Sequence, residues 1–379
     1  MNLSLSDEQV FLREAARGTL SRFKTFEANR EALDGNSEAL PDLWPAAKEA
    51  GWPGLLIAEQ HGGAGLDAFD AMLVLGECGR VLAPIALLGH LPASAILNDS
   101  PAGASLLEPL ASGERRAAYL PVSPPDDLSQ KWTVDPASGL QRGDAPTASA
   151  SADGVSVSGK LAFVPDAPGA DLLVGVALLD GKPVGIAIEA SASGVSVEAT
   201  TRYDASRSLG HVVLENAPAI VLDASEQSLA SAWYLAQSLL AAESLGSVET
   251  ALDVSVEYAK ERHTFGRAIG SYQAVKHSLT EVLRQLDNGR SLLYYAGWAR
   301  GGAPGEFPLA ASAARSVAGR ALDTASRTMI SVHGGTGATW EHDAPLYFRR
   351  AQLSRRLLGG TAGATDRVAG ELMLQADAA

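Results

Sequence analysis

The chain has 379 residues, of which 46% are hydrophobic and 20% charged, and its formal net charge is −14. One hydrophobic core rarely holds so many residues, so we expect two or three domains. The negative charge argues against nucleic acid or an anionic membrane as a partner, because both require a basic surface. No signal-peptide pattern or membrane-spanning apolar run is visible, so we expect a cytoplasmic protein.

Residues 1–112 predict an N-terminal helical domain. Ser6 followed by Gln9 is typical of a capping box, and apolar residues at helical spacing come next. The turn-rich segment His61–Asp67 precedes a second predicted helix that carries Cys78. Because Cys78 is the only cysteine, it cannot form an internal disulfide, and we interpret it as a core residue.

Residues 113–225 predict a compact β domain, either a barrel or a sandwich. Val155, Val157, Leu161 and Phe163 alternate along the chain and should share one buried face of a strand. Further strands are predicted at Leu172–Leu179, Val184–Ile188, Val195–Val197 and Val212–Leu214. The segment Ser123–Ser151 is polar and rich in proline, so we expect a long loop there.

Residues 226–379 predict a C-terminal four-helix bundle. Two helical stripes support it, formed by Leu229, Trp233, Ala236 and Leu240, and by Val275, Leu279, Val282 and Leu286. We expect the helices to be separated at Gly289, at residues 301–308 and at residues 334–337. The fold class is therefore α+β, and a cleft between the β domain and the bundle is a common place for a flat cofactor.

The first chemical motif is Glu261–Gly266, followed by Gln273. Arg262 and Thr264 lie at a predicted helix end, where an arginine, a hydroxyl and free amides can hold a pyrophosphate. The alternative is that Arg262 only pairs with a carboxylate on the surface.

The second motif is His333–Gly337, followed by Trp340–Asp343. Its glycines allow close approach of the backbone to a ligand, or form an ordinary helix end. His333, His342 and Asp343 lack the compact spacing of metal ligands, so we expect no metal site.

Three segments resemble the acyl-CoA dehydrogenase family: Tyr258–Leu283, His333–Ala351 and, more weakly, Gly51–Leu66. The predicted order of helical, β and helical domains also matches that family. The resemblance implies a flavoprotein that uses FAD to dehydrogenate an acyl-CoA thioester between its α and β carbons.

In that family, two subunits share each FAD, and the neighbouring subunit contacts the ADP half. By this resemblance the ADP contacts here would come from Arg262, Thr264, Phe265, Gln273, Gly334 and Gly335. Ser331 is a departure, because family members usually carry glutamine there.

The catalytic base of the family, a glutamate, is missing from both of its usual positions. In the turn after the Arg-Arg-Ala segment, the position falls on Leu358 or Gly359. The second position falls on Ala236, and its neighbour, often arginine in the family, is Gln237. None of these side chains can accept the α-proton.

The flavin-ring contacts of the family are also replaced. The loop expected to bind the flavin reads Pro121–Pro125, and the strand expected against the ring reads Phe163–Pro165. Pro165 has neither a hydroxyl nor an N–H with which to bind a flavin.

The resemblance therefore implies a subunit that supplies ADP-side contacts to the FAD of a catalytic partner and is inactive alone. Heteromeric acyl-CoA dehydrogenases of this kind, with α2β2 assembly, act in actinobacterial breakdown of lipids and steroid side chains. The acyl-CoA would bind mainly in the partner.

Two alternatives stay open. In one, the chain is a self-sufficient homomeric dehydrogenase whose base is Glu243, on the same apolar stripe as Ala236. Glu243 could equally pair with an arginine or histidine inside the bundle. In the other alternative, the chain is a flavin-free structural or CoA-binding protein.

Overall fold

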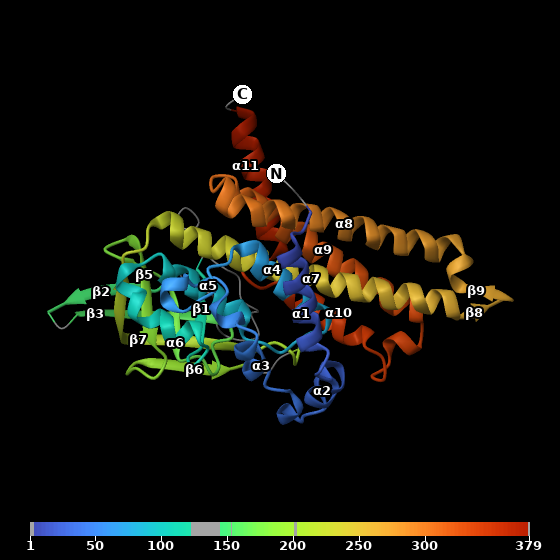
Figure 1. Ribbon diagram of the computed structural model, residues 1–379, viewed down its shortest axis with the longest axis horizontal. Coiled ribbons are helices and arrows are strands. Elements are labelled where there is room, and N and C mark those ends of the chain that lie inside the picture. The colour runs from blue at the N-terminus through green and yellow to red at the C-terminus, as the bar shows by residue number, and fades with distance from the viewer. Residues whose placement is uncertain (1–3, 123–144, 153, 201–202, 378–379) are drawn as a thin grey trace.

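The computed structural model describes residues 4–122, 145–152, 154–200 and 203–377 (Figure 1). Helices come first, strands follow and helices return, as the sequence predicts for this α+β class. The sheet lies at one end of the molecule, and the long C-terminal helices extend away from it.

Six helices open the chain: α1 (Asp7–Leu20), α2 (Thr25–Leu33), α3 (Trp44–Glu49), α4 (Ala68–Arg80), α5 (Leu87–Asn98) and α6 (Leu107–Ala111). Short 3-10 turns connect them: η1 (Ser37–Ala39), η2 (Trp52–Gly54), η3 (Glu59–His61) and η4 (Pro101–Leu106). The predicted capping box is confirmed, because the Ser6 hydroxyl accepts from the Gln9 amide and the Gln9 side chain accepts from the Ser6 amide. Cys78 is fully buried in α4, as expected of a core residue.

Seven strands form the middle of the chain: β1 (Ala117–Leu120), β2 (Thr147–Ser151), β3 (Gly154–Pro165), β4 (Leu172–Leu179), β5 (Lys182–Glu189), β6 (Val195–Ala199) and β7 (Leu209–Leu222). Strands β4, β2, β3, β7 and β5 pair in this order, and β5 pairs with β4 again. This ring of pairings closes a barrel, one of the two predicted forms. Strand β1 adds to β4, and β6 adds to β7.

Two predictions about the strands are wrong. Val164 is fully buried in β3 whereas Phe163 is only partly buried, because two register shifts against β7 interrupt the alternation and Phe163 has a positive φ of 54°. Thr147–Ser151 forms β2 instead of belonging to a loop. The remaining part of the predicted loop, residues 123–144, lies outside the described residues.

Five helices complete the chain: α7 (Glu226–Glu261), α8 (Gln273–Gly302), α9 (Phe307–His333), α10 (Ala344–Ser354) and α11 (Gly360–Asp377). Between α7 and α8 lie a small hairpin, β8 (His263–Thr264) and β9 (Arg267–Ala268), and the 3-10 turn η7 (Ile269–Ser271). The turn η8 (Thr336–Ala338) follows α9. Helices α7, α8, α9 and α11 are the four long helices of the predicted bundle.

Gly289 does not separate two helices, contrary to the prediction, but lies inside α8. A Cβ at this position would come within 2.6 Å of the Leu245 Cδ2 atom. The glycine therefore serves close packing of α8 on α7, which propensity alone does not indicate.

Glycines also bring α4 and α7 into close contact. A Cβ at Gly246 would collide with the backbone oxygen of Gly76, and one at Gly79 would collide with that of Glu243. The Ser247 hydroxyl donates to the Gly79 oxygen at 2.7 Å. This crossing fixes the backbone of α7 at Glu243.

Among the described residues, none of the helices combines the length and the apolar character needed to cross a membrane.

Candidate functional site

The first predicted motif lies at the tip of the bundle, opposite the sheet (Figure 1). Arg262 follows the end of α7, and the β8–β9 hairpin turns at Phe265 and Gly266, which both have positive φ. The Tyr272 hydroxyl donates to the Thr264 oxygen at 3.0 Å and holds the hairpin against the start of α8. Phe265 is 92% exposed, so its ring is available to a second molecule.

The second predicted motif reaches the same end of the bundle. His333 ends α9, and its ring lies 4.3 Å from the Tyr258 ring, one turn before Arg262. Gly334 has a φ of 61°, which favours glycine. The fold thus brings Arg262 and the Gly334–Gly335 loop to one end of the molecule.

The ADP-side residues fit a pyrophosphate. Arg262 makes no ion pair within the described part of the chain, so its guanidinium is available to an anion. A Cβ at Gly334 or Gly335 would meet nothing within 4 Å, which leaves open space beside their backbone. Gln273 is exposed at the first position of α8. The Arg262 guanidinium and the Gln273 side chain are donors that suit a phosphate group in a second subunit.

The three residues considered as metal ligands have other partners. His333 Nδ1 contacts the Met329 oxygen at 2.8 Å, and His342 Nδ1 accepts from the Ala344 amide at 3.0 Å. Asp343 pairs with Arg30. The described residues contain no cluster of three or more side chains that could bind a metal ion.

Both family base positions are buried and apolar. Ala236 has no exposed surface, and Leu358 is 2% exposed. A hydrogen bond from α7 holds the turn that contains Leu358 in place, because Gln237 Nε2 donates to the Leu358 oxygen at 2.8 Å. Arg315 donates to the Leu357 oxygen at 3.3 Å. The turn therefore carries structural hydrogen bonds, and its side chains offer no proton acceptor.

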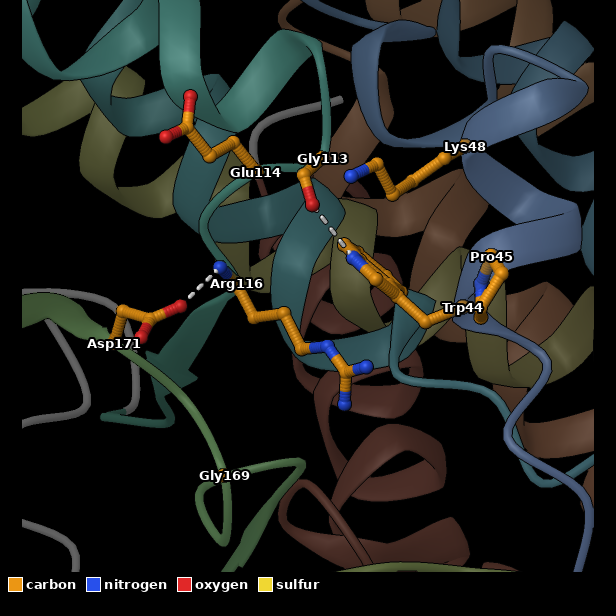
Figure 2. Close-up of a pocket in the computed structure, with 8 residues that line it drawn as sticks. All are labelled: Trp44, Pro45, Lys48, Gly113, Glu114, Arg116, Gly169 and Asp171. Atoms are coloured by element: carbon orange, nitrogen blue, oxygen red, sulfur yellow. Dashed lines mark hydrogen bonds between the residues drawn. The ribbon is translucent and has the colours of Figure 1, made fainter.

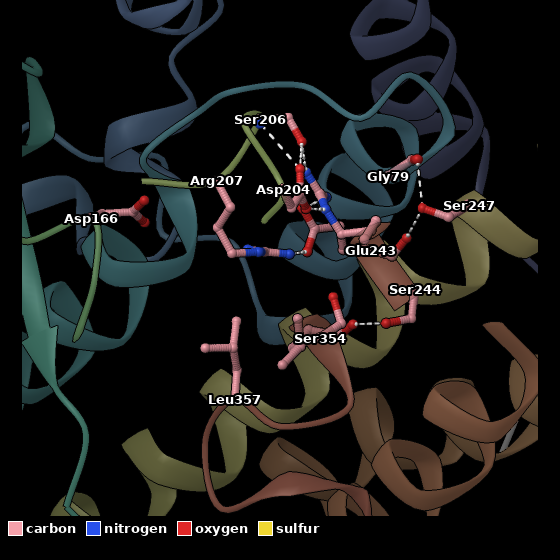
Figure 3. A network of polar contacts seen from close by, with 12 residues as sticks. Gly79, Asp166, Asp204, Ser206, Arg207, Glu243, Ser244, Ser247, Ser354 and Leu357 are labelled. Carbon is pink, nitrogen blue, oxygen red and sulfur yellow. Dashed lines mark hydrogen bonds and ion pairs between the residues drawn. The ribbon is translucent and has the colours of Figure 1, made fainter. Parts of the chain in front are cut away.

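Glu243 lies in a buried ionic cluster that also contains Asp204, Ser206, Arg207 and Arg350 (Figure 3). Arg350 donates to Glu243 Oε1 at 2.6 Å, to Asp204 Oδ2 at 2.5 Å and to Ser206 Oγ at 2.5 Å. Arg207 pairs with the other Glu243 oxygen, Oε2. Both carboxylate oxygens of Glu243 therefore pair with arginines. The sequence left two roles open for Glu243, catalysis and pairing inside the bundle, and this arrangement is the second.

This Glu243 cluster joins three parts of the fold. Asp204, Ser206 and Arg207 come from the segment between β6 and β7, Glu243 from α7 and Arg350 from α10. Burial alone would raise the pKa of Asp204, but the charges of Arg350 and Arg207 outweigh burial and lower that pKa. The cluster fills the junction of sheet and bundle with paired charges.

Sequence reasoning missed Asp204, Arg207 and Arg350. Charged side chains usually lie on the surface, and no spacing in the chain distinguishes these from exposed ones. The residues predicted to contact the ADP half of FAD could hold its pyrophosphate, whereas Pro165 offers a flavin ring neither a hydroxyl nor an N–H.

Asp166 is a further buried carboxylate beside this junction. Its Oδ2 accepts from the Gly89 amide at 2.7 Å. Burial raises its pKa to about 7, although the Gly89 hydrogen bond and the charges of Arg207 and Arg116 oppose this, while Glu243 adds to it. Since the folded-state pKa exceeds the ordinary value of 3.8, stability falls as the pH rises through this interval.

We expect Asp166→Asn to remove this pH dependence. The asparagine oxygen can still accept from Gly89, and it carries no charge at any pH. In urea denaturation, the stability of the variant relative to wild type should be greater at pH 8 than at pH 5 by roughly 2–3 kcal/mol. An equal difference at both pH values would contradict the assignment of the pKa.

A surface cavity of about 480 Å³ lies between α3, the turn before β1 and the loop before β4 (Figure 2). The Trp44 indole donates to the Gly113 oxygen at 2.8 Å, and the Arg116 guanidinium lies 5.0 Å from the Trp44 ring. Lys48 and Glu114 add charges of opposite sign. None of the predicted cofactor-binding residues lines this cavity.

Two parts of the chain match families defined from known proteins. Residues 6–121 match the N-terminal domain of acyl-CoA dehydrogenases, and residues 235–373 match the C-terminal domain. Acyl-CoA dehydrogenase IpdE2 of Mycobacterium tuberculosis is 30% identical over 93% of this chain and 93% of its own length. Acyl-CoA dehydrogenase FadE34 of the same organism is 31% identical over 95% of this chain, which spans 47% of FadE34.

Solved structures share the fold over almost the whole chain. The "Tcur3481-Tcur3483 steroid ACAD G363A variant" is 27% identical with a TM-score of 0.85, covering 99% of this chain and 100% of that one. The ChsE4-ChsE5 complex from Mycobacterium tuberculosis is 24% identical with a TM-score of 0.86, covering 98% and 99%. The fold, both domain matches and the relative with 30% identity lead to one conclusion: the chain belongs to the acyl-CoA dehydrogenase family.

Proposed function

We propose that this chain is the non-catalytic subunit of a heteromeric, FAD-dependent acyl-CoA dehydrogenase. It supplies Arg262, Thr264, Phe265 and Gln273, with the backbone of Gly334 and Gly335, to the ADP half of a FAD whose ring lies in a catalytic partner. The assembly is an α2β2 heterotetramer, and the acyl-CoA is a fatty acyl or steroid side-chain thioester bound mainly by the partner.

The observation that carries this proposal is the state of the positions considered for a base from the sequence. Ala236 and Leu358 have no proton acceptor, and Glu243 places both carboxylate oxygens against Arg207 and Arg350. A carboxylate whose two oxygens both face arginines directs its lone pairs at them instead of at a substrate carbon. This argues against the self-sufficient enzyme with Glu243 as base.

The separation of Arg262 from Glu243 along α7 supports the same proposal. Arg262 lies about 28 Å of helix rise beyond Glu243, at the exposed tip of the bundle. The ADP contacts are therefore outside the filled junction of sheet and bundle. They are placed where a second subunit can approach, which favours the proposal over a flavin-free structural role.

The names of the similar structures agree with a paired assembly. Tcur3481-Tcur3483 is called a steroid ACAD, and ChsE4-ChsE5 is called a complex. A likeness at 27% identity supports a steroid or lipid acyl-CoA as the substrate class. Within the assembly, FAD would accept the hydride from the substrate β-carbon, and this chain's Arg262 would fork to the pyrophosphate and fix the cofactor between subunits.

Co-expression tests the proposal. The chain should be produced together with a catalytic acyl-CoA dehydrogenase from the same organism as candidate partner, and the partner should also be produced alone. We expect flavin and acyl-CoA-dependent bleaching only in the co-purified complex, because the partner alone lacks the ADP contacts. A partner that retains equal flavin and activity without this chain would contradict the proposed role.

A further inference from the structure

An exposed stack of three side chains lies beside the Glu243 cluster and is formed by Tyr203, Trp340 and Arg349. The Arg349 guanidinium lies 4.4 Å from the centre of the Tyr203 ring and 4.9 Å from that of the Trp340 ring. Arg349 Nη1 also donates to the Tyr203 oxygen at 2.8 Å. The three residues, called the Arg349 surface below, come from the β6–β7 segment, the α9–α10 loop and α10.

The Arg349 surface is partly exposed to solvent, although its residue types are enriched in protein–protein interfaces. Tyr203 is 50% exposed and Trp340 is 49% exposed. Within the described residues, Arg349 forms no ion pair, so its charge has no carboxylate partner. Tyrosine, tryptophan and arginine are the residues that contribute most to protein–protein binding when they become covered.

The Arg349 surface is also held in place before any partner binds. The next residue, Arg350, points inward and is anchored by Glu243 and Asp204, which fixes this turn of α10. Tyr203 immediately precedes Asp204, so the same ionic cluster positions both sides of the stack. Little conformational entropy is then lost when a partner covers it.

Ring contacts connect the Arg349 surface with the ADP-side residues. Trp340 lies in the loop that begins at Gly334, and His342 of that loop packs 4.2 Å from the His333 ring. His333 in turn packs on Tyr258, one turn before Arg262. A subunit that reaches the Gly334–Gly335 backbone with its FAD therefore approaches the same loop that carries Trp340.

We propose that the Arg349 surface is a docking site for the catalytic partner subunit. The partner would present a carboxylate to Arg349 and an apolar group that covers the rings of Tyr203 and Trp340. This inference rests on the proposed heteromeric function and adds where the two subunits hold each other.

The test is the dissociation constant of the purified complex, measured by titrating the partner with variants of this chain. Trp340→Ala and Arg349→Gln should each weaken the complex about 10- to 100-fold, because each removes a central contact. Phe11→Ala on α1 and Trp298→Ala on α8 are matched controls, since both rings are exposed elsewhere on the molecule. They should leave the dissociation constant within about twofold of wild type.

The melting temperature of each variant alone should match wild type, because the altered side chains are half exposed. If the complex forms and Trp340→Ala and Arg349→Gln bind like the controls, the docking site is wrong and the proposed function stands. If wild type forms no complex at all, the docking site and the proposed function both fail.

Discussion

Replacing Glu243 with alanine should destabilise the chain by about 3–5 kcal/mol, because Arg207 and Arg350 then stay buried without the carboxylate that pairs with both. Urea denaturation of the variant and of wild type measures the difference. A large part of the loss should persist in Glu243→Gln, which preserves shape and one acceptor but removes the charge.

Glu249 provides the matched control on the same helix. It also pairs with two arginines, Arg80 and Arg290, but its side chain is 31% exposed. Glu249→Ala should therefore cost only about 1 kcal/mol. If Glu243→Gln kept full stability but abolished an acyl-CoA-dependent activity of the chain, Glu243 would be a catalytic base and the structural role would be refuted.

Arg262→Ala should lower the affinity of the complex for FAD about 10- to 100-fold. A charge-assisted hydrogen bond to the pyrophosphate contributes about 1.5–3 kcal/mol, and the alanine variant loses it. Flavin retained by the co-purified complex after dialysis, followed by titration with FAD, measures this loss.

Arg267→Ala is the control for this experiment, since Arg267 lies on the same hairpin but packs on the Tyr272 ring at 4.0 Å. It should retain FAD much better than Arg262→Ala does. If the Arg262→Ala complex retained as much FAD as the wild-type complex, Arg262 would not contact the ADP half. The proposed subunit assembly would be unaffected by that result.

The sequence predicts those elements whose local pattern agrees with their final environment. Leu172–Leu179 forms a strand with the predicted bounds because an uninterrupted apolar run suits a buried strand. Ser6 forms its predicted cap because the capping box depends only on residues three apart.

Predictions fail where contacts between residues far apart in the sequence determine the local structure. Strand β2 consists of small residues, threonine, alanine and serine, and its pairing with β3 and β4 makes it a strand. Gly289 lies inside α8, where the absence of a Cβ leaves room for the Leu245 side chain of α7.

The Glu243 cluster is a clearer example of contacts that the sequence does not predict. Arg349 and Arg350 are identical neighbours in sequence, yet Arg349 is only partly buried whereas the Arg350 side chain is 1% exposed inside the Glu243 cluster. The sequence identified Glu243 as unusual because it lies on an apolar stripe, but its partners come from distant segments. The roles of Arg262 and the Gly334–Gly335 loop remain predictions of the family resemblance that their exposed placement supports.

We expect that this chain, by itself, does not hold the flavin ring. The most direct measurement is the absorbance spectrum of the chain purified alone, with added FAD and then an acyl-CoA. We expect no stoichiometric flavin absorbance and no bleaching on addition of the thioester. A stoichiometric flavin spectrum that bleaches with acyl-CoA would contradict that expectation.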